Sequence, residues 1–323
     1  MQKVSFNINY NFHLTTSIET YNNNFIYCII KFKNFFLLST SNGYILMYDI
    51  NTYKIKQKLK LSESSIKYMY LLKENYILFC SLSGELIIIE INEYYNIIQI
   101  LDKNVTDSIK KCIQFSNGNL ICSCSNKFIK FWKKENNGNN YLYDKEIDIN
   151  PKLIYNIIEI NDNEICSIEK DDIKNTFNIN YYINFYNINE KKIIVSLISN
   201  KELVLQCQSA IKYDDNLLII GANQFLIFIN YLEHKFVRFL NIDYKPWSIY
   251  KLLNNNLLLG DSKGNIYHLN LFDKENLNIK VLNKSNKVLK MMINYILEIK
   301  DKNSHKIIIG GNDEFFKIFE TLN

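Results

Sequence analysis

Short apolar runs and polar turns alternate along the chain in a pattern that repeats seven times. In each copy an apolar run ends in a small residue, a polar turn follows, and a second apolar run ends in a large residue. The large residues that close the copies are Tyr48, Ile89, Trp132, Tyr186, Ile229, Leu269 and Phe319. Apart from two longer gaps they recur about every 40–45 residues, the period of a four-stranded β-propeller blade.

A further apolar run precedes each copy, often across a turn that bears Asn or Asp. Asn and Asp tolerate left-handed backbone conformations, so they can replace the scarce glycine in tight hairpins. Runs such as Ile87-Ile88-Ile89 lack alternation, which indicates strands covered on both faces. The sequence therefore predicts an all-β, seven-bladed β-propeller of four-stranded blades. We expect residues 1–323 to form this one propeller, with blades at about 25–61, 66–101, 109–149, 154–198, 204–240, 247–281 and 288–320.

The two ends of the chain complement each other. Few residues follow Phe319-Glu320, too few for the outer strand of the seventh blade, whereas residues 2–9 have strand character. We therefore predict that the N-terminal segment, residues 1–12, joins the last blade and closes the ring, because closure protects strands that would otherwise be open edges.

Two insertions interrupt the repeat. Residues 133–143 contain an Asn- and Gly-rich run, which is typical of a flexible loop. Residues 170–180 lengthen a loop of the fourth blade on the opposite rim. The sequence leaves open whether either insertion has a function or is merely tolerated.

The third and seventh copies resemble the WD-repeat (tryptophan–aspartate) β-propeller family. Residues 123–132 read Ser-Cys-Ser-Asn-Lys-Phe-Ile-Lys-Phe-Trp and are similar to the family's Gly-Ser-x-Asp-x-x-Ile-Lys-Leu-Trp stretch; residues 310–320 give a second match. The resemblance covers essentially the whole chain and implies the propeller fold. The chain departs from the family pattern, because only Trp132 occupies the Trp position and no His follows a Gly. The family's Asp–His–Ser–Trp hydrogen-bond network therefore cannot form in its usual version.

Composition argues against a nucleic-acid or phosphate ligand and against a membrane span, and it indicates where in the cell the protein is located. The net charge of +5 is a mild excess, and Arg238 is the only arginine, whereas nucleic-acid and phosphate sites favour the bidentate arginine fork. No stretch of about 18 apolar residues predicts a membrane span, and no apolar signal segment begins the chain. The seven cysteines lie mostly in apolar runs, as expected for reduced thiols. We expect an intracellular protein, cytoplasmic first and nuclear as the alternative.

Catalytic and metal-binding patterns are weak in this sequence. It has no Gly-x-Ser-x-Gly, Walker or His-Glu-x-x-His motif. Cys122 and Cys124 share one face of a predicted strand, but no His or Cys pair supplies the remaining zinc ligands. His268 lies inside an apolar strand, where packing is the simpler interpretation. We expect no catalytic residue, no metal, no cofactor and no small-molecule substrate.

Binding of a protein or peptide is the favoured function, because loops on a rigid scaffold are where function concentrates. The prediction is a non-catalytic protein–protein interaction scaffold. Its candidate partner-binding residues lie in loops on one face and are Tyr244, Lys245, Trp247, Lys263, Lys287, Asp313, Asp171 and Asp172. Trp is enriched among interface hot spots, although Trp247 can also be interpreted as the start of a buried strand. The alternatives are a phosphoinositide or nucleic-acid reader and a propeller enzyme.

Overall fold

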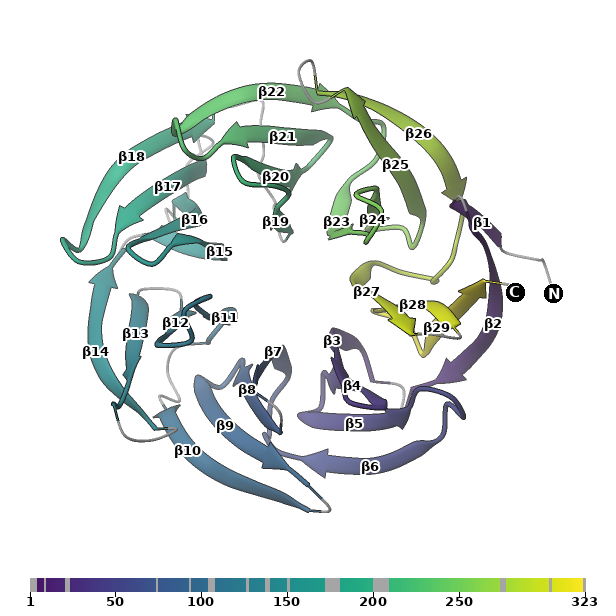
Figure 1. The fold of residues 1–323 in the computed structure, drawn as a ribbon, viewed down its shortest axis with the longest axis horizontal. Helices are drawn as coiled ribbons and strands as arrows, with labels where there is room; N and C mark the ends of the chain where they lie inside the picture. Colours follow the sequence, from purple (N-terminus) through teal and green to yellow (C-terminus); the bar gives the residue numbers. More distant parts are fainter. Residues whose placement is uncertain are drawn as a thin grey trace. The chain divides into compact units, whose positions relative to one another are not determined.

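The computed structural model consists of β-strands and their connections over the residues that it describes. These residues are 5–8, 10–20, 24–73, 75–92, 94–103, 108–125, 128–136, 140–149, 152–171, 181–199, 209–273, 277–301 and 304–321. Their strands form seven antiparallel sheets, six with four strands and one with five (Figure 1). The fold is the predicted all-β, seven-bladed β-propeller with four-stranded blades.

In the first six blades the four strands follow one another in chain order. We call the first strand of each blade its inner strand and the fourth its outer strand. Blades 1 to 3 comprise β3 (Ile26–Phe32), β4 (Phe35–Thr40), β5 (Tyr44–Asp49) and β6 (Ile55–Lys60); β7 (Ile66–Lys73), β8 (Tyr76–Ser81), β9 (Glu85–Ile91) and β10 (Tyr95–Lys103); β11 (Lys111–Gln114), β12 (Leu120–Cys124), β13 (Phe128–Lys134) and β14 (Tyr141–Asp148).

Blades 4 to 6 repeat this order. They comprise β15 (Lys152–Asn161), β16 (Glu164–Asp171), β17 (Tyr181–Asn187) and β18 (Lys192–Ser199); β19 (Ala210–Lys212), β20 (Leu217–Ala222), β21 (Phe225–Asn230) and β22 (Lys235–Asn241); β23 (Pro246–Lys251), β24 (Leu257–Asp261), β25 (Ile266–Asp273) and β26 (Asn278–Ser285). The seventh blade contains β27 (Ile293–Asp301), β28 (Ser304–Gly311) and β29 (Phe315–Thr321).

The strands group into two compact units. Unit 1 consists of Met1–Lys31, Cys207–Ile229 and Phe236–Asn323, and unit 2 of Phe32–Gln206 and Asn230–Lys235. Each unit has its own apolar clusters, built from side chains of neighbouring blades. In unit 2, Leu78 and Ile88 of blade 2 pack with Ile121 and Trp132 of blade 3. In unit 1, Leu258 of blade 6 packs with Ile293 and Phe319 of blade 7.

Burial along the strands explains why the apolar runs lack alternation. Every residue of β20 and of β24 is buried, since both faces of these second strands are covered. The outer strand β22 instead alternates between exposed and half-buried side chains. A strand covered on both faces needs apolar residues throughout, whereas an outer strand needs them only at every second position.

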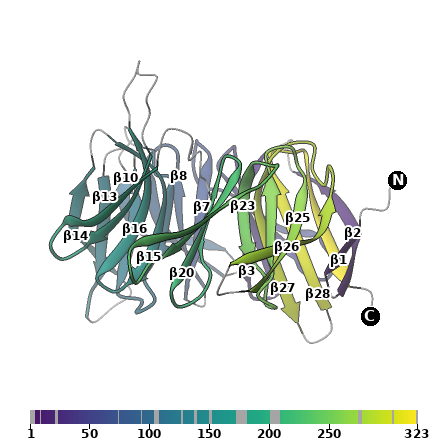
Figure 2. The ribbon, with the colours of Figure 1, turned by 90° about the horizontal axis from the view of Figure 1, so that it is seen from above.

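The N-terminal region completes the seventh blade in unit 1. Its sheet has the order β1-β2-β29-β28-β27, in which β2 (Tyr10–Glu19) pairs antiparallel with β29 and β1 (Ser5–Ile8) pairs with β2 (Figures 1 and 2). The closing role of the N-terminus is therefore confirmed. Its position shifts, because the strand beside β29 begins at Tyr10, and within the predicted segment only Ser5–Ile8 are described as a strand, the additional fifth strand β1.

Three further boundaries differ from those expected. Blade 7 begins at Ile293, not near 288, because Val288 and Leu289 are buried in a loop that packs on the core of unit 1. The insertion predicted over 133–143 is shorter, since β13 extends to Lys134 and β14 begins at Tyr141. Of the insertion at 170–180, only the first two residues are described, and they end β16.

The described cysteines are buried and form no disulfide with one another, as expected; they are Cys28, Cys80, Cys112, Cys122, Cys124 and Cys166. Cys207 lies outside the described residues. Over the same parts of the chain, the structure contains no helix long and apolar enough to cross a membrane.

Candidate functional site

A β-bulge recurs near the start of the inner strands. Pairing with the second strand skips one residue in blades 2, 4, 6 and 7, and the skipped residues are Lys67, Tyr155, Trp247 and Asn294. Blade 3 has a similar arrangement, because the backbone N–H of Lys110 donates to the carbonyl of Cys124 (2.9 Å) while Lys111 is the register partner of Cys124. We call these five side chains the bulge residues; they are Lys67, Lys110, Tyr155, Trp247 and Asn294.

Each bulge residue follows a buried residue and is itself half-buried or exposed. A bulge inserts an extra residue into a strand and re-aims its side chain, so these positions escape the in-and-out alternation of a regular strand. The second strands behind them are mostly buried. The bulge residues are therefore suited to display side chains in fixed positions, and each unit has its own candidate site: Lys67, Lys110 and Tyr155 in unit 2, and Trp247 and Asn294 in unit 1.

Trp247 is a bulge residue of unit 1 and links blades 6 and 7. Its indole N–H donates to Oδ1 of Asn294, the bulge residue of blade 7 (3.1 Å). The Asn294 amide in turn donates to Asn312 Oδ1 and to the carbonyl of Ile26, both at 2.7 Å. The ammonium of Lys245 lies 5.8 Å from the Trp247 ring centre. Trp247 is thus a half-exposed bulge residue, and its counterpart in blade 7 is Asn294.

Tyr244, a second predicted binding residue, belongs to the packing of blade 6. Its ring stacks on Tyr267 with 3.5 Å between ring centres, and burial raises the pKa of its hydroxyl above the usual range. The Tyr267 hydroxyl donates to Oδ2 of the buried Asp261 at 3.1 Å.

Lys263 and Lys287 lie on one seam of unit 1, where the β24–β25 turn meets the loop that enters blade 7. Both side chains are exposed. The backbone N–H of Lys263 donates to Asp261 Oδ1 (2.8 Å), and that of Lys287 donates to Asn265 Oδ1 (2.9 Å). Their side chains remain candidates for binding, because only their backbones are engaged in these bonds.

Asp313 is buried and supports a neighbouring loop of unit 1. Its Oδ2 accepts the backbone N–H of Lys290 at 2.5 Å. This bond holds the chain just before the inner strand of blade 7. Asp313 therefore has a structural partner, whereas a contact with another protein stays a prediction.

The acidic pair predicted in blade 4 is only partly described. Asp171 is buried at the end of β16 and accepts the hydroxyl of Tyr182 at 3.2 Å. Asp172 lies outside the described residues.

A buried carboxylate that sequence reasoning missed, Glu169, lies two residues before Asp171. It accepts the hydroxyl of Tyr186 (2.6 Å), the amide of Asn184 (2.7 Å) and the hydroxyl of Ser167, and the Lys152 ammonium lies 3.6 Å away. Burial, and next the charge of Glu169, raise the pKa of Tyr186 above the usual range. A buried carboxylate with this many partners is a structural element of the blade.

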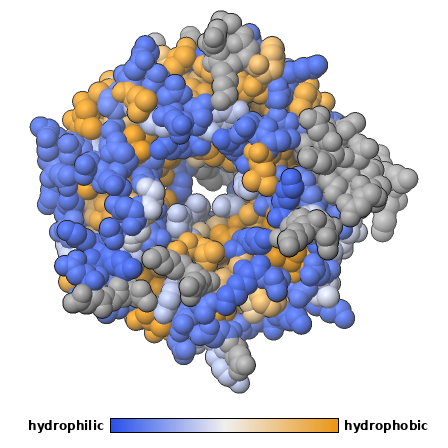
Figure 3. Space-filling model, in the orientation of Figure 1, coloured by the Kyte–Doolittle hydropathy of each residue, from blue (hydrophilic) through white to orange (hydrophobic). Residues whose placement is uncertain are grey.

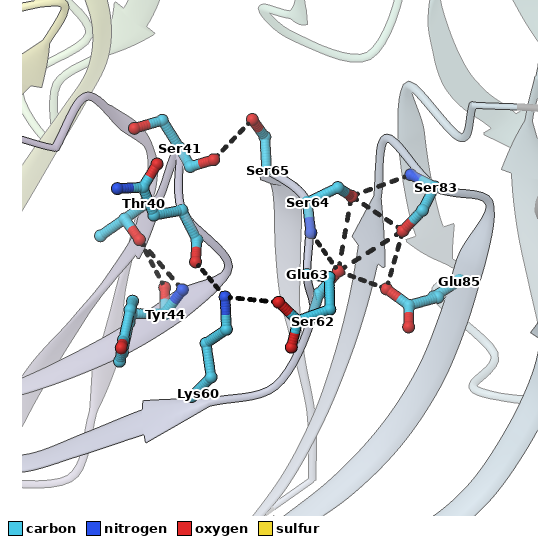
Figure 4. Close-up of polar contacts among 11 residues, drawn as sticks. Thr40, Ser41, Tyr44, Lys60, Ser62, Glu63, Ser64, Ser65, Ser83 and Glu85 are labelled. Carbon is cyan, nitrogen blue, oxygen red and sulfur yellow. Dashed lines mark hydrogen bonds and ion pairs between the residues drawn. The ribbon is translucent and has the colours of Figure 1, made fainter.

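In unit 2, hydroxyl groups converge on Glu85 where the loop that enters blade 2 meets the β8–β9 turn (Figure 4). Glu85 Oε2 accepts the hydroxyls of Ser81 (2.8 Å), Ser83 (3.0 Å) and Ser62. Ser64 Oγ lies 2.8 Å from Ser83 Oγ and also accepts the backbone N–H of Ser83 at 2.9 Å. These bonds fasten the loop to the turn. The residues come from separate segments, so only the folded chain reveals the network.

The same loop and the end of β6, which precedes it, are fastened to the β4–β5 turn of blade 1. Ser65 Oγ donates to the carbonyl of Ser41 (2.9 Å), and the Lys60 ammonium donates to the carbonyl of Asn42 (2.9 Å) (Figure 4). Because β7 begins directly after Ser65, both sets of bonds fix the start of that strand. They therefore fix the backbone that carries the bulge residue Lys67.

Lys67 and Lys110 occupy the bulges of adjacent blades in unit 2. The two blades are joined beside them, since the N–H of Ile109 donates to the carbonyl of Ser81 at 3.2 Å. Burial lowers the pKa of Lys67 to about 8. Burial, and next the positive charge of Lys67, lower the pKa of Lys110. The fold thus holds two lysines together in a setting that disfavours their charge.

Replacement of Lys67 by glutamine should stabilise the protein at neutral pH. In the folded state the pKa of Lys67 is about 8, below its ordinary value of 10.5. Between about pH 8 and pH 10.5 the unfolded chain therefore binds more protons than the folded chain, and stability rises with pH. Because Lys67 is partly exposed and screened by solvent, we expect a gain of about 1–2 kcal/mol at pH 7. The gain should vanish near pH 10.5.

Urea denaturation of the Lys67→Gln and wild-type proteins at both pH values measures this difference. Lys56→Gln is the matched control, because Lys56 is exposed on β6, and it should change the free energy of unfolding by less than about 0.5 kcal/mol. A Lys67→Gln protein that is less stable than wild type at pH 7 would contradict the lowered pKa of Lys67.

Within the described part of the chain, no group of three or more His, Cys, Asp or Glu side chains is placed to hold a metal ion. Burial raises the pKa of Cys124 to about 12 and those of Cys80 and Cys122 well above their usual value. A thiol is reactive as the thiolate, so these buried groups are structural.

On the face drawn in Figure 3, hydrophilic residues predominate and hydrophobic residues form scattered patches. No protein-family model matches the chain, and a search of curated proteins finds no match. The case for function therefore rests on the geometry of the bulge residues.

Proposed function

We propose that the chain is a non-catalytic scaffold that binds a protein or peptide through the bulge residues of its inner strands. The observation that carries this proposal is the recurrence of the bulge, which presents a lysine, tyrosine, tryptophan or asparagine side chain at the same place in several blades. Groups held by a rigid scaffold lose little conformational entropy on binding. Tyr and Trp, two of the residue types presented, are enriched among interface hot spots.

The proposed absence of catalysis is supported by the way the buried carboxylates are used. Glu169 and Asp261 are surrounded by donors from their own blades, and Asp313 caps a backbone N–H. A general acid or base must reach the proton that it transfers. Carboxylates engaged in this way fit a supporting role.

We also infer that the propeller is a divergent member of the WD-repeat family. Trp132, the one Trp at the family position, is 2% exposed and packs in the third strand of blade 3. Asp313, at the family's Asp position, lies in the turn before β29 and accepts a backbone N–H. Six buried free thiols fit an intracellular protein, with the cytoplasm as the proposed location.

Purification of the tagged protein from its native cells tests the proposed function. Tyr155→Ala removes a bulge residue of unit 2, and Tyr94→Ala is the matched control, since Tyr94 is 78% exposed next to the outer strand of blade 2. We expect a partner in fixed ratio with the wild type and with Tyr94→Ala, and at least about tenfold less with Tyr155→Ala. Equal melting temperatures would show that both variants fold. A partner retained in full by Tyr155→Ala would contradict the proposal.

A further inference from the structure

The outer strand of blade 2, β10 in unit 2, exposes apolar side chains to solvent. The large apolar residues that are exposed on β10 or just before it are Tyr94, Tyr95, Ile97, Ile98 and Ile100. β10 is also the last strand of its sheet, and among the described residues its only strand partner is β9 (Figure 1). An apolar strand with an open backbone edge is a template for pairing with another strand. β10 therefore offers both an apolar surface and a pairing edge.

Polar side chains hold β10 in position against blade 3. Gln99 Nε2 donates to the carbonyl of Tyr141 at 2.5 Å, and Gln99 Oε1 accepts the N–H of the same residue at 2.8 Å. Farther along the strand, Asp102 pairs with the Lys130 ammonium at 2.7 Å. These contacts use one face of β10 and fix the strand before any partner arrives.

The opposite face of β10 carries a row of exposed apolar side chains. Tyr95, Ile97 and Ile100 are the register partners of three β9 residues spaced two apart, which are Ile91, Ile89 and Ile87. Residues two apart on a strand share a face, and so do directly paired residues. The three side chains on β10 therefore line one face, beside the open edge of the sheet.

β10 also lacks the charges that protect other outer strands. The run from Tyr95 to Leu101 contains no charged residue, and Lys103 ends the strand. The outer strands of blades 1, 3, 5 and 6 each contain at least two charged residues, among them Lys58, Lys145, Arg238 and Lys280. Charges on an edge strand oppose its pairing with a second copy, because like charges would meet.

Two copies of β10 are complementary when they run antiparallel. Their uncharged centres then face each other, so no like charges meet there. The Tyr95 end of each strand lies beside the Lys103 end of the other, where an ammonium group and an aromatic ring attract each other. A strand that complements itself in this way favours a second copy of the same chain over an unrelated partner.

The exposed area also fits a dimer of this kind. The five exposed side chains named above present roughly 500 Å² of apolar surface. Each chain contributes about 800 Å² to a standard-size interface, of which about 65% is apolar in homodimers. The apolar surface at β10 is therefore large enough for one half of a stable dimer.

We propose that β10 pairs antiparallel with β10 of a second copy of this chain, joining the blade 2 sheets of the two chains into one. The two-fold axis of the dimer passes near Ile98, the centre of the uncharged run. This inference goes beyond the proposed function, since none of the bulge residues lies on β10.

Sedimentation equilibrium of the full chain tests the proposal. At about 50 µM, well above the micromolar dissociation constants of weak standard-size interfaces, we expect twice the mass of one chain. Ile97→Lys/Ile100→Lys should weaken the dimer at least about hundredfold, because the interface would bury unpaired charges. Circular dichroism would show that the variant folds, as expected for residues that are 55% and 49% exposed.

The matched control is Ile193→Lys/Ile198→Lys on β18, the outer strand of blade 4. These residues are 42% and 56% exposed, and the change in net charge is the same. The interior of β18 is also uncharged, but fewer large apolar residues are exposed on it. We expect the dissociation constant of the dimer to stay within about twofold of the wild-type value.

A cysteine at the proposed two-fold axis gives a second measurement. Oxidised Ile98→Cys protein should form a disulfide-linked dimer on a non-reducing gel, because the axis brings the two side chains together. Ile198→Cys should stay a monomer on the gel, and the wild-type protein gives the background.

Three outcomes would overturn the proposal. A wild-type protein that keeps the mass of one chain at 50 µM would leave β10 to a different protein. An equal loss in the β18 control would place the contact elsewhere, and a mass that rises without limit would indicate open-ended association. The proposed function fails separately, when no other protein depends on Tyr155.

Discussion

Deletion of residues 1–19 should lower the free energy of unfolding by about 5 kcal/mol or more, which is comparable to the whole stability of many domains. The deletion removes β2, whose Leu14, Thr16 and Ile18 are half-buried. It would uncover β29, where Phe316 and Phe319 are 0% exposed in the intact protein. An apolar strand would become an open edge, with a risk of aggregation.

Deletion of residues 1–9 is the matched control for that experiment. It removes β1, which pairs with β2 and not with β29, so we expect a loss of about 1 kcal/mol or less. Urea denaturation and thermal melting of the two shortened proteins give the comparison. If the shorter deletion were as damaging as the longer one, the order β1-β2-β29 would be wrong.

Gly264→Ala should destabilise the protein by about 4 kcal/mol, well beyond the strain of a left-handed residue. Gly264 has φ +79°, and a Cβ there would lie 2.0 Å from the carbonyl oxygen of Leu289. The two backbones lie this close because they are hydrogen-bonded: the carbonyl of Gly264 accepts the N–H of Leu289 at 3.1 Å. Gly43 repeats the arrangement in blade 1, where a Cβ would lie 1.9 Å from the carbonyl oxygen of Ser62.

Gly118→Ala separates backbone strain from steric conflict. Gly118 has a similar φ of +74°, but the nearest atom to its Cβ position is Gln114 Nε2, a side-chain atom at 3.7 Å. We expect a loss of about 1 kcal/mol for this variant. Denaturation curves for the two alanine variants should therefore differ by about 3 kcal/mol. Equal losses would mean that the turn of blade 6 does not dock on the next loop as described.

The repeat was enough to predict the fold, because burial of a strand on both faces leaves a clear apolar signature. Ile307-Ile308-Ile309 and its counterparts all lie in second or third strands. The boundaries were harder to predict. Val288 and Leu289 are as apolar as strand residues, but they lie in a loop that covers the core. In the outer strand β2 the apolar residues are separated by Thr, Ser and Glu, so the strand has no continuous apolar run.

The candidate site could be predicted only in part. Trp247 stands out as one of two tryptophans, but Lys67 and Lys110 do not stand out among 38 basic residues. A bulge adds one residue to a strand without changing its composition, so the periodicity of the sequence does not mark it. The Glu85 network joins residues from separate loops, and no local pattern predicts such contacts.

Site-specific photocrosslinking tests the central claim, that the bulge residues contact the partner, most directly. A benzophenone amino acid would replace Tyr155 in one protein and the outer Tyr94 in another, each expressed in the native cells. We predict that the partner is crosslinked from position 155 and not from position 94. Crosslinking from position 94 alone would contradict the account and place the binding surface on the outer strands.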